Sequence, residues 1–154
     1  MKKVLYISII FVAFTTSLSG QIVEREGVYY DENSELYSGL YREYFESGQV
    51  KVEMAVRKGQ QHGLTRIFFE NGSLNEIRSF NKGLMNGTWM TWNDKNTKIG
   101  EANYKKGKKD GKWYIWDENG TLRYDMTYKN GKKVGTWLIY DEKGEQVSSK
   151  NYDD

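Results

Sequence analysis

Cysteine and proline are both absent from this chain of 154 residues, and histidine occurs once. Without cysteine there is no disulfide bond and no thiol nucleophile, and cysteine usage says nothing about the redox compartment. The single His62, expected to be an exposed residue beside a turn, leaves no Cys–His dyad, and no serine lies in a recognisable nucleophile turn. We therefore expect no enzyme activity and no catalytic residues.

A strong net charge is also lacking, because 23 Lys and Arg nearly balance 21 Asp and Glu, for a net charge of +2. Nothing in this balance predicts binding to nucleic acid, and membrane-surface contact is not expected. Aromatic residues are abundant at 15%, and glycine occurs 16 times. Many aromatic and few aliphatic residues suit a thin sheet, which wide rings and long charged stems can cover.

The first twenty residues have the pattern of a secretory signal peptide. Met1-Lys2-Lys3 is a short positive start, residues 4–14 are apolar apart from Ser8, and a small polar run follows. The apolar run is shorter than the roughly 20 residues that span a membrane as a helix. We expect cleavage after Ser19 or Gly20 and a periplasmic or secreted protein. An uncleaved anchor helix is the alternative; a lipoprotein is not expected, because no cysteine follows.

The rest of the sequence repeats with a fixed period. Five glycines stand 24 residues apart: Gly39, Gly63, Gly87, Gly111 and Gly135. A constant period indicates a repeat architecture. With each of these glycines as position 1, the repeats are 39–62, 63–86, 87–110, 111–134 and 135–154. The preceding segment 21–38 is expected to be an N-terminal capping hairpin.

Two further columns of the repeat predict turns. Position 10 is glycine except for one asparagine, which indicates a left-handed backbone there: Gly48, Gly72, Asn96, Gly120 and Gly144. Asn71-Gly72 and Asn119-Gly120 are favoured pairs for a tight hairpin turn. Position 21 supplies a second turn: Gly59, Gly83, Gly107 and Gly131. Between the turns, residues 122–129 alternate apolar and polar, as a strand with one wetted face does. Each repeat is therefore predicted to be one β-hairpin.

Charged columns accompany the turns. Position 8 is always acidic: Glu46, Glu70, Asp94, Glu118 and Glu142. Equal positions of adjacent hairpins are roughly 9.6 Å apart, too far to share one Ca²⁺ ion. We expect these acids to accept hydrogen bonds from turn amides instead of binding a metal or catalysing a reaction. Lysines surround the position-21 turns, so a basic row is expected along one long side and acidic turns along the other.

Aromatic columns occupy positions 3 and 6. Position 3 holds Tyr41, Thr65, Trp89, Trp113 and Trp137; position 6 holds Tyr44, Phe68, Trp92, Trp116 and Tyr140. The two positions have opposite parity along a strand. Either a bulge intervenes or both faces of the sheet carry aromatic side chains.

The pattern Gly-x-Trp-x-x-Tyr/Trp-x-Glu-Asn-Gly-x-Leu, followed by Tyr-Lys-Asn-Gly-Lys-x-x-Gly, resembles the bacterial variant of the MORN repeat. Residues 111–135 match it best, and the resemblance extends over 39–152; Thr65, Glu76 and Arg78 depart from it. The resemblance implies an elongated, single-layer, twisted antiparallel meander of stacked hairpins. It also implies a non-enzymatic interaction role, and some bacterial members are labelled antitoxin components.

Two functional hypotheses follow. The first is a non-catalytic scaffold that binds another protein, as an antitoxin or an envelope protein does. The second is a module that binds cell-wall glycan or another carbohydrate through its aromatic columns. In both, the candidate binding residues are those of the last three repeats: Trp89, Trp92, Trp113, Trp116, Trp137 and Tyr140. No cofactor and no metal are predicted, and the partner and the oligomeric state stay open.

Overall fold

The computed structural model describes residues 22–153, in which all regular structure is β-strand. The signal peptide expected at residues 1–20 lies outside this range. In the described part, no helix has the length and apolar character needed to cross a membrane. The strands are β1 (Val23–Arg25), β2 (Val28–Tyr30), β3 (Gly39–Tyr44), β4 (Val50–Arg57), β5 (Gln60–Phe68), β6 (Leu74–Asn81), β7 (Leu84–Met85), β8 (Gly87–Trp92), β9 (Lys98–Lys105), β10 (Lys108–Trp116), β11 (Leu122–Lys129), β12 (Lys132–Tyr140) and β13 (Gln146–Asn151).

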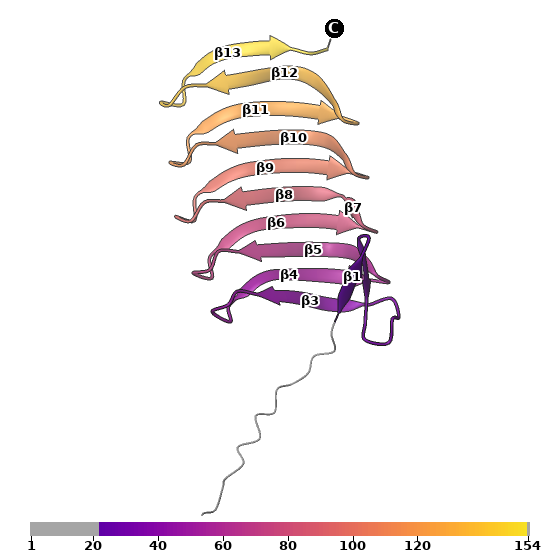
Figure 1. The fold of residues 1–154 in the computed structure, drawn as a ribbon. Coiled ribbons are helices and arrows are strands. Elements are labelled where there is room, and N and C mark those ends of the chain that lie inside the picture. Colours follow the sequence, from indigo (N-terminus) through magenta and orange to yellow (C-terminus); the bar gives the residue numbers. More distant parts are fainter. Residues whose placement is uncertain (1–21, 154) are drawn as a thin grey trace, which may run out of the picture.

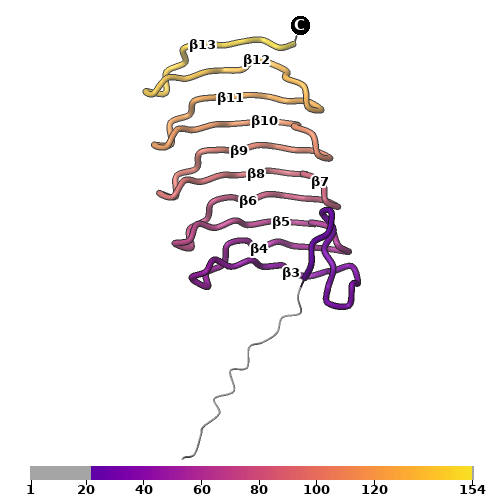
Figure 2. Tube along the Cα trace, viewed as in Figure 1, coloured from indigo at the N-terminus to yellow at the C-terminus, as the bar shows by residue number. Residues whose placement is uncertain are grey.

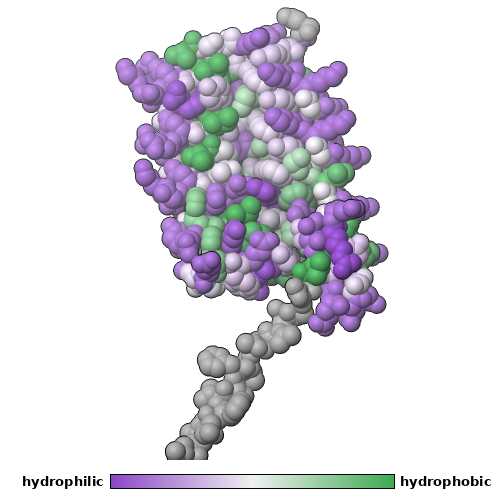
Figure 3. Space-filling model, viewed as in Figure 1, coloured by the Kyte–Doolittle hydropathy of each residue, from purple (hydrophilic) through white to green (hydrophobic). Residues whose placement is uncertain are grey.

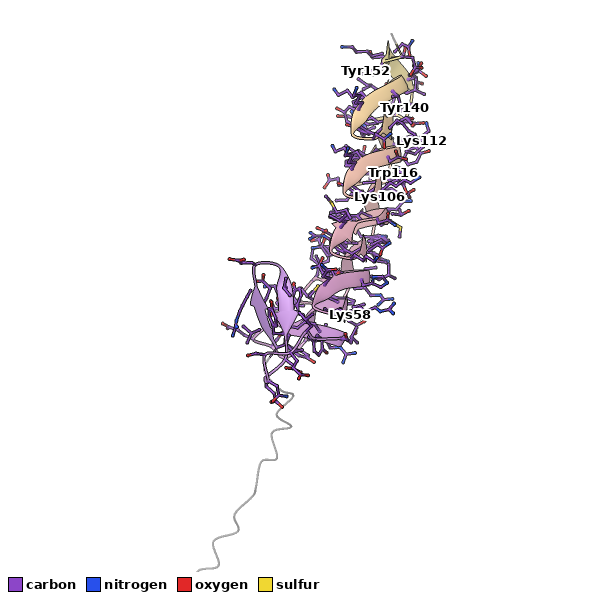
Figure 4. All side chains as sticks on the ribbon, turned by 90° about the vertical axis from the view of Figure 1, so that its right-hand side faces the viewer. Lys58, Lys106, Lys112, Trp116, Tyr140 and Tyr152 are labelled. Atoms are coloured by element: carbon purple, nitrogen blue, oxygen red, sulfur yellow. The ribbon has the colours of Figure 1, made fainter. Side chains whose placement is uncertain are left out.

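Strands β3 to β13 form one antiparallel sheet of eleven strands in sequence order, with the short β7 paired to β6. Each hairpin lies directly on the one before it, and β3 and β13 are the two edges (Figures 1 and 2). Seen along the strands, the sheet is one layer thick (Figure 4). The predicted all-β meander of stacked hairpins is confirmed.

The position-21 glycines form two-residue turns on one long side of the sheet. In these turns both central residues have positive φ, for example Lys82 at 51° and Gly83 at 75°. Positive φ at both positions defines a type I′ turn, whose twist matches that of the flanking strands. Asparagine occupies the first central position only in Asn130-Gly131; lysine does so at Lys58, Lys82 and Lys106. We call this side the lysine margin.

The turns of the other long side are longer than predicted. In the fourth repeat Gly120 has φ 86°, whereas Asn119 is not left-handed, so Asn119-Gly120 is not a two-residue turn. The turn is closed by hydrogen bonds from Gly120 N to Asp117 O (3.0 Å) and from Asp117 N to Thr121 O (2.9 Å). The predicted left-handed backbone at position 10 is confirmed in all five repeats, including Asn96 at 60°.

The expectation for the acidic column at position 8 was wrong. In the third, fourth and fifth repeats the turn amides bond to the side chain one residue earlier, at position 7. Asp117 Oδ1 accepts from the backbone N–H of Asn119 and of Thr121, both at 3.0 Å. Asn93 and Asp141 make the same pair of bonds. A side chain at position 7 begins the turn and can reach the amides two and four residues ahead, whereas the position-8 acids are exposed.

Both faces of the sheet carry aromatic side chains. A register shift follows position 5 in every repeat; in the fourth, Ile115 pairs with Tyr124 and Trp116 with Leu122. The extra residue, Arg123, lies in the second strand of the hairpin, so alternation along the first strand is preserved. Positions 3 and 6 therefore point to opposite faces.

Segment 22–38 folds onto one face of the sheet and adds no strand to its edge. Strands β1 and β2 form a separate two-stranded sheet, and Tyr30 and Leu36 form an isolated bridge beyond it. Figure 4 shows this hairpin standing on one side of the main sheet only. Tyr29 N donates to Gly59 O at 2.8 Å, and the Tyr29 ring lies 5.6 Å from that of Tyr41.

The most buried side chains lie beneath this hairpin. Met54, Val56 and Thr65 are exposed by only 3%, 5% and 5%, and Met126, at 7%, is the other buried hydrophobic residue of the described chain. Val56 and Thr65 occupy columns that hold rings in later repeats. The hairpin thus supplies apolar cover where the repeat side chains are too small to cover themselves.

Candidate functional site

One face of the sheet carries a continuous row of rings, which we call the ladder face. Positions 3 and 18 alternate along it, with centroid separations of 5.6, 4.8, 5.2, 5.2, 5.1 and 4.8 Å between successive members of the series Phe80, Trp89, Tyr104, Trp113, Tyr128, Trp137 and Tyr152. All six pairs are tilted or edge-on, the geometry that aromatic rings prefer. A ring contact therefore links each pair of neighbouring strands on this face, from β6 and β8 to β12 and β13.

The indoles of the ladder also bond to the preceding repeat. Trp89 Nε1 donates to Ser79 O (3.2 Å), Trp113 Nε1 to Asn103 O (3.1 Å) and Trp137 Nε1 to Thr127 O (3.0 Å). In each case the acceptor belongs to position 17. The repeated bond fixes each indole to its neighbour and satisfies its only polar atom.

Cations lie over the ladder rings, and two of them are lysines from the strand starts beside the lysine margin. Lys109 Nζ is 4.1 Å from the centroid of Trp113, and Lys133 Nζ is 4.6 Å from that of Trp137. Arg78 Cζ lies 5.2 Å from the Trp89 ring. Each indole therefore meets tyrosine or phenylalanine on its two sides and a cation over its ring.

The opposite face is more polar. Trp116 lies on it with Tyr114, their centroids 5.5 Å apart, and Lys98 Nζ is 4.4 Å from the Trp116 ring. Ion pairs cross the strands there, including Lys112 Nζ to Asp125 Oδ1 at 2.6 Å. Arg42 and Arg66 both pair with Glu53, at 2.9 and 3.2 Å. Half-exposed pairs of this kind contribute little stability each.

An apolar hollow of about 310 Å³ opens on the ladder face near its C-terminal end. Its lining is Ile115, Tyr124, Met126, Trp137, Leu138, Ile139 and Tyr152. Ile115 and Tyr124 are exposed by 42% and 40%. Figure 3 shows this face, with a pale and green central band between hydrophilic margins formed by the two series of turns.

A second hollow, of about 280 Å³, lies in the lysine margin and is lined by Lys105, Lys106, Lys108, Asp110, Lys129 and Asn130. The Asp110 carboxylate accepts a hydrogen bond from Asn130 N at 3.0 Å and lies 3.6 Å from Lys129 Nζ. The backbone bond and, after it, the lysine charges lower the pKa of Asp110. This carboxylate is thus occupied in holding two adjacent turns together.

Two findings concern metal ligands and the single histidine. In 22–153, no group of three or more His, Asp and Glu side chains is placed to hold a metal ion. His62 lies inside β5 and is half-buried, so the expectation of an exposed turn residue was wrong. The surface can make apolar, aromatic and cationic contacts.

The six residues predicted as a binding site do not form one surface. Trp89, Trp113 and Trp137 belong to the ladder face, and Trp92, Trp116 and Tyr140 to the opposite face. All six are half-buried. The prediction missed Ile115, Tyr124 and Ile139, which line the hollow. Each of them lies two residues from Trp113, Met126 or Trp137, and residues two apart in a strand share a face. This spacing could have predicted that they lie on the ladder face.

The MORN repeat variant model matches residues 37–55, 61–82 and 109–130. No curated protein matches the chain. The crystal structure of the GtfA/B complex bound to UDP and GlcNAc aligns with 87% of this chain and 24% of its own, at 8% identity and a TM-score of 0.30. A TM-score this low supports no functional conclusion. The matched segments fall in the first, second and fourth hairpins, so the chain contains repeats that match the MORN repeat variant.

Proposed function

We propose that this protein is a non-catalytic interaction scaffold of the periplasm or cell exterior, which binds another protein through the C-terminal part of its ladder face. The observation that carries the proposal is the open apolar hollow beside Ile115 and Tyr124. Apolar and aromatic side chains in a concave site are where binding energy concentrates in protein interfaces. MORN repeats are commonly interaction repeats, which is compatible with this role.

The available area suits a protein partner. The six strands from β8 to β13 span roughly 29 Å across the sheet, and strands of about seven residues span roughly 23 Å. The product is about 700 Å², close to the roughly 800 Å² that each partner contributes to a standard interface. A rigid sheet also loses little conformational freedom when it binds.

The state of the indole rings favours protein over glycan. A sugar stacks on an open ring face, but Lys109 and Lys133 lie over Trp113 and Trp137, and tyrosines flank both. The side chains left most open in the hollow are Ile115 and Tyr124. Carbohydrate binding is the alternative, and it predicts that soluble peptidoglycan fragments or neutral glycans change tryptophan fluorescence.

Site-specific photocrosslinking tests the proposal. Benzoylphenylalanine replaces Tyr124 on the ladder face or, as the matched control, Tyr114 on the opposite face, in the full chain expressed in its own host. We expect one defined protein crosslinked at Tyr124 and not at Tyr114. Its capture should be lost in Ile139→Glu, with the far-UV circular dichroism spectrum unchanged. Equal crosslinking at both positions, or a glycan response without a protein partner, would overturn the proposal.

Two finer parts of the proposal have their own tests. Export predicts that N-terminal sequencing of the protein from the periplasm or medium finds Gly20 or Gln21 first; an intact Met1 in the cytoplasmic fraction contradicts it. An antitoxin role requires a toxin gene next to this one and rescue of growth on co-expression. Rescue that survives Ile139→Glu would exclude the ladder face from that role.

A further inference from the structure

Neighbouring repeats join on the ladder face by the same contact three times. The position-18 ring of one repeat meets the position-3 ring of the next in the pairs Phe80–Trp89, Tyr104–Trp113 and Tyr128–Trp137, at 5.6, 5.2 and 5.1 Å. Each of these indoles also donates to the position-17 carbonyl just before that ring. In all three cases, the strand that follows a position-18 ring presents a position-3 tryptophan to it.

Within residues 22–153, the fifth repeat offers this contact and no strand receives it. Tyr152 has Trp137 on one side at 4.8 Å, and in residues 22–153 no strand pairs with the outer side of β13. Tyr152 N donates to Gly135 O at 3.0 Å, toward the preceding strand β12. Because backbone groups alternate in direction along a strand, the backbone N–H and C=O groups of Ser149 and Asn151 point away from β12, toward the free edge. Asn151 stands at position 17, whose carbonyl receives the indole in earlier repeats.

Lys150 adds a charge preference. It occupies the frame position of Met126, which lines the hollow together with Trp137 and Ile139, the position-3 and position-5 residues of the next strand. A strand added to β13 would place its own position-5 side chain diagonally across from Lys150 on the ladder face. An acidic residue there is complementary to the lysine.

At the other edge of the sheet, a side chain from the N-terminal segment already occupies a backbone carbonyl of β3. The Leu40 carbonyl of β3 accepts a hydrogen bond from the Tyr37 hydroxyl at 3.0 Å. Within the array, the equivalent Lys112 carbonyl accepts from Asn103 Nδ2 of the preceding repeat at 2.8 Å. Tyr37 thus takes the place of a preceding repeat, and a second copy that stacked β3 onto β13 would compete with Tyr37 for this carbonyl.

From these observations we propose that the outer edge of β13 binds an extended segment of another protein, which adds to the sheet as an antiparallel strand and carries Trp-x-Glu or Trp-x-Asp. The tryptophan packs on Tyr152 and donates its indole N–H to Asn151 O, and the acid faces Lys150. Strand addition at a sheet edge takes affinity from backbone bonds and specificity from alternate side chains. This inference rests on the proposed protein-binding function and names the partner chemistry.

A labelled peptide tests it directly. The probe is fluorescein-labelled Lys-Val-Gly-Thr-Trp-Leu-Glu-Tyr, the sequence of residues 133–140 with Glu in place of Ile139. Anisotropy titrations with the full chain should show saturable binding, weakened at least tenfold when the peptide tryptophan is alanine. A phenylalanine peptide should fall between them, because it keeps the ring and loses the indole bond. Equal binding of all three peptides would overturn the proposal.

Variants of the chain locate the site. Ser149→Pro removes an outward N–H and no inward bond, so it should abolish peptide binding with an unchanged denaturation midpoint. Tyr152→Ala should weaken binding at least tenfold and Tyr152→Phe much less. The Lys150→Glu variant should no longer bind the Glu peptide, and it should bind the same peptide with Lys in place of Glu. Binding that survives Ser149→Pro contradicts edge addition.

Two results separate this inference from its alternatives. Sedimentation that shows a dimer of the full chain, abolished by Ser149→Pro, would mean that β13 accepts a second copy, and it would overturn the proposal. A crosslink at Tyr124 that persists in Ser149→Pro, together with absent peptide binding, would refute strand addition and leave the proposed function standing.

Discussion

Replacing one indole on each face measures how much the ladder stabilises the sheet. Trp113→Ala and Trp116→Ala each delete a half-buried tryptophan from the same strand, β10, and each removes one lysine contact, at 4.1 and 4.4 Å. Both side chains are half-buried, so neither variant deletes a fully buried or a fully exposed ring. What differs is the number of specific contacts.

Trp113 has ring neighbours on both sides, Tyr104 and Tyr128, each at 5.2 Å, and its indole donates to Asn103 O. Trp116 has one ring neighbour, Tyr114, and its indole has no hydrogen-bond partner among the described residues. The additional ring pair contributes about 0.5–1.5 kcal/mol, and the hydrogen bond about 1 kcal/mol. We expect Trp113→Ala to lower the free energy of unfolding by about 2 kcal/mol more than Trp116→Ala does.

Urea denaturation of both purified variants, followed by far-UV circular dichroism, gives the comparison. The slope of the unfolding free energy against urea should be the same in both, so that the difference reflects native contacts. Equal losses, or a greater loss in Trp116→Ala, would refute the conclusion that the ladder face holds the repeats together.

Three further predictions concern single sites. Lys82→Asn should raise the free energy of unfolding by about 0.5–1 kcal/mol in thermal or urea denaturation, because asparagine tolerates the positive φ of 51° better than lysine; Asn130→Lys, its converse control, should lower it. Thr65→Val should raise the free energy of unfolding by about 1 kcal/mol, because the buried Thr65 hydroxyl lacks a hydrogen-bond partner. Thr65→Ser keeps the hydroxyl and loses the methyl group, so it should lower the free energy of unfolding. A stabilised serine variant would contradict this. The pKa of Asp110 is lowered in the folded state, so its carboxylate stabilises the fold above the unfolded pKa of about 4, and this stabilisation is lost as the pH falls through the folded pKa. Asp110→Asn should therefore flatten the dependence of the unfolding free energy on pH in that acidic range. An unaltered pH dependence would exclude the turn contact.

The period of the sequence was enough to predict the fold because each hairpin contacts only its neighbours. The two glycine columns require positive φ, and Asn96 in one of them already indicated a left-handed backbone. The position-7 side chain of the turn was also readable, since Asn93, Asp117 and Asp141 stand two and four residues before the amides that they bind. The prediction assigned that role to the neighbouring acidic column because that column is more regular.

The surface was harder to predict than the fold. A bulge in the first strand would have brought positions 3 and 6 to one face; the bulge lies in the second strand, at Arg123, and separates Trp113 from Trp116. No local pattern locates a bulge of this kind. The docking of segment 22–38 was equally hidden, because it depends on tertiary contacts of Tyr29 with Tyr41 and Gly59.

Removal of one whole repeat tests the central claim most directly, which is that hairpin modules in a fixed 24-residue frame stack through ring contacts with their neighbours. Deleting residues 87–110 joins Asn86 to Gly111 and brings Phe80 against Trp113, which preserves every column. We predict a shorter chain with a β-sheet circular dichroism spectrum, dispersed amide signals in nuclear magnetic resonance and cooperative unfolding. Deleting residues 87–109 instead shifts the frame by one and should give a chain without these properties. Equal folding of the two deletions, or unfolding of the in-frame one, would contradict the account.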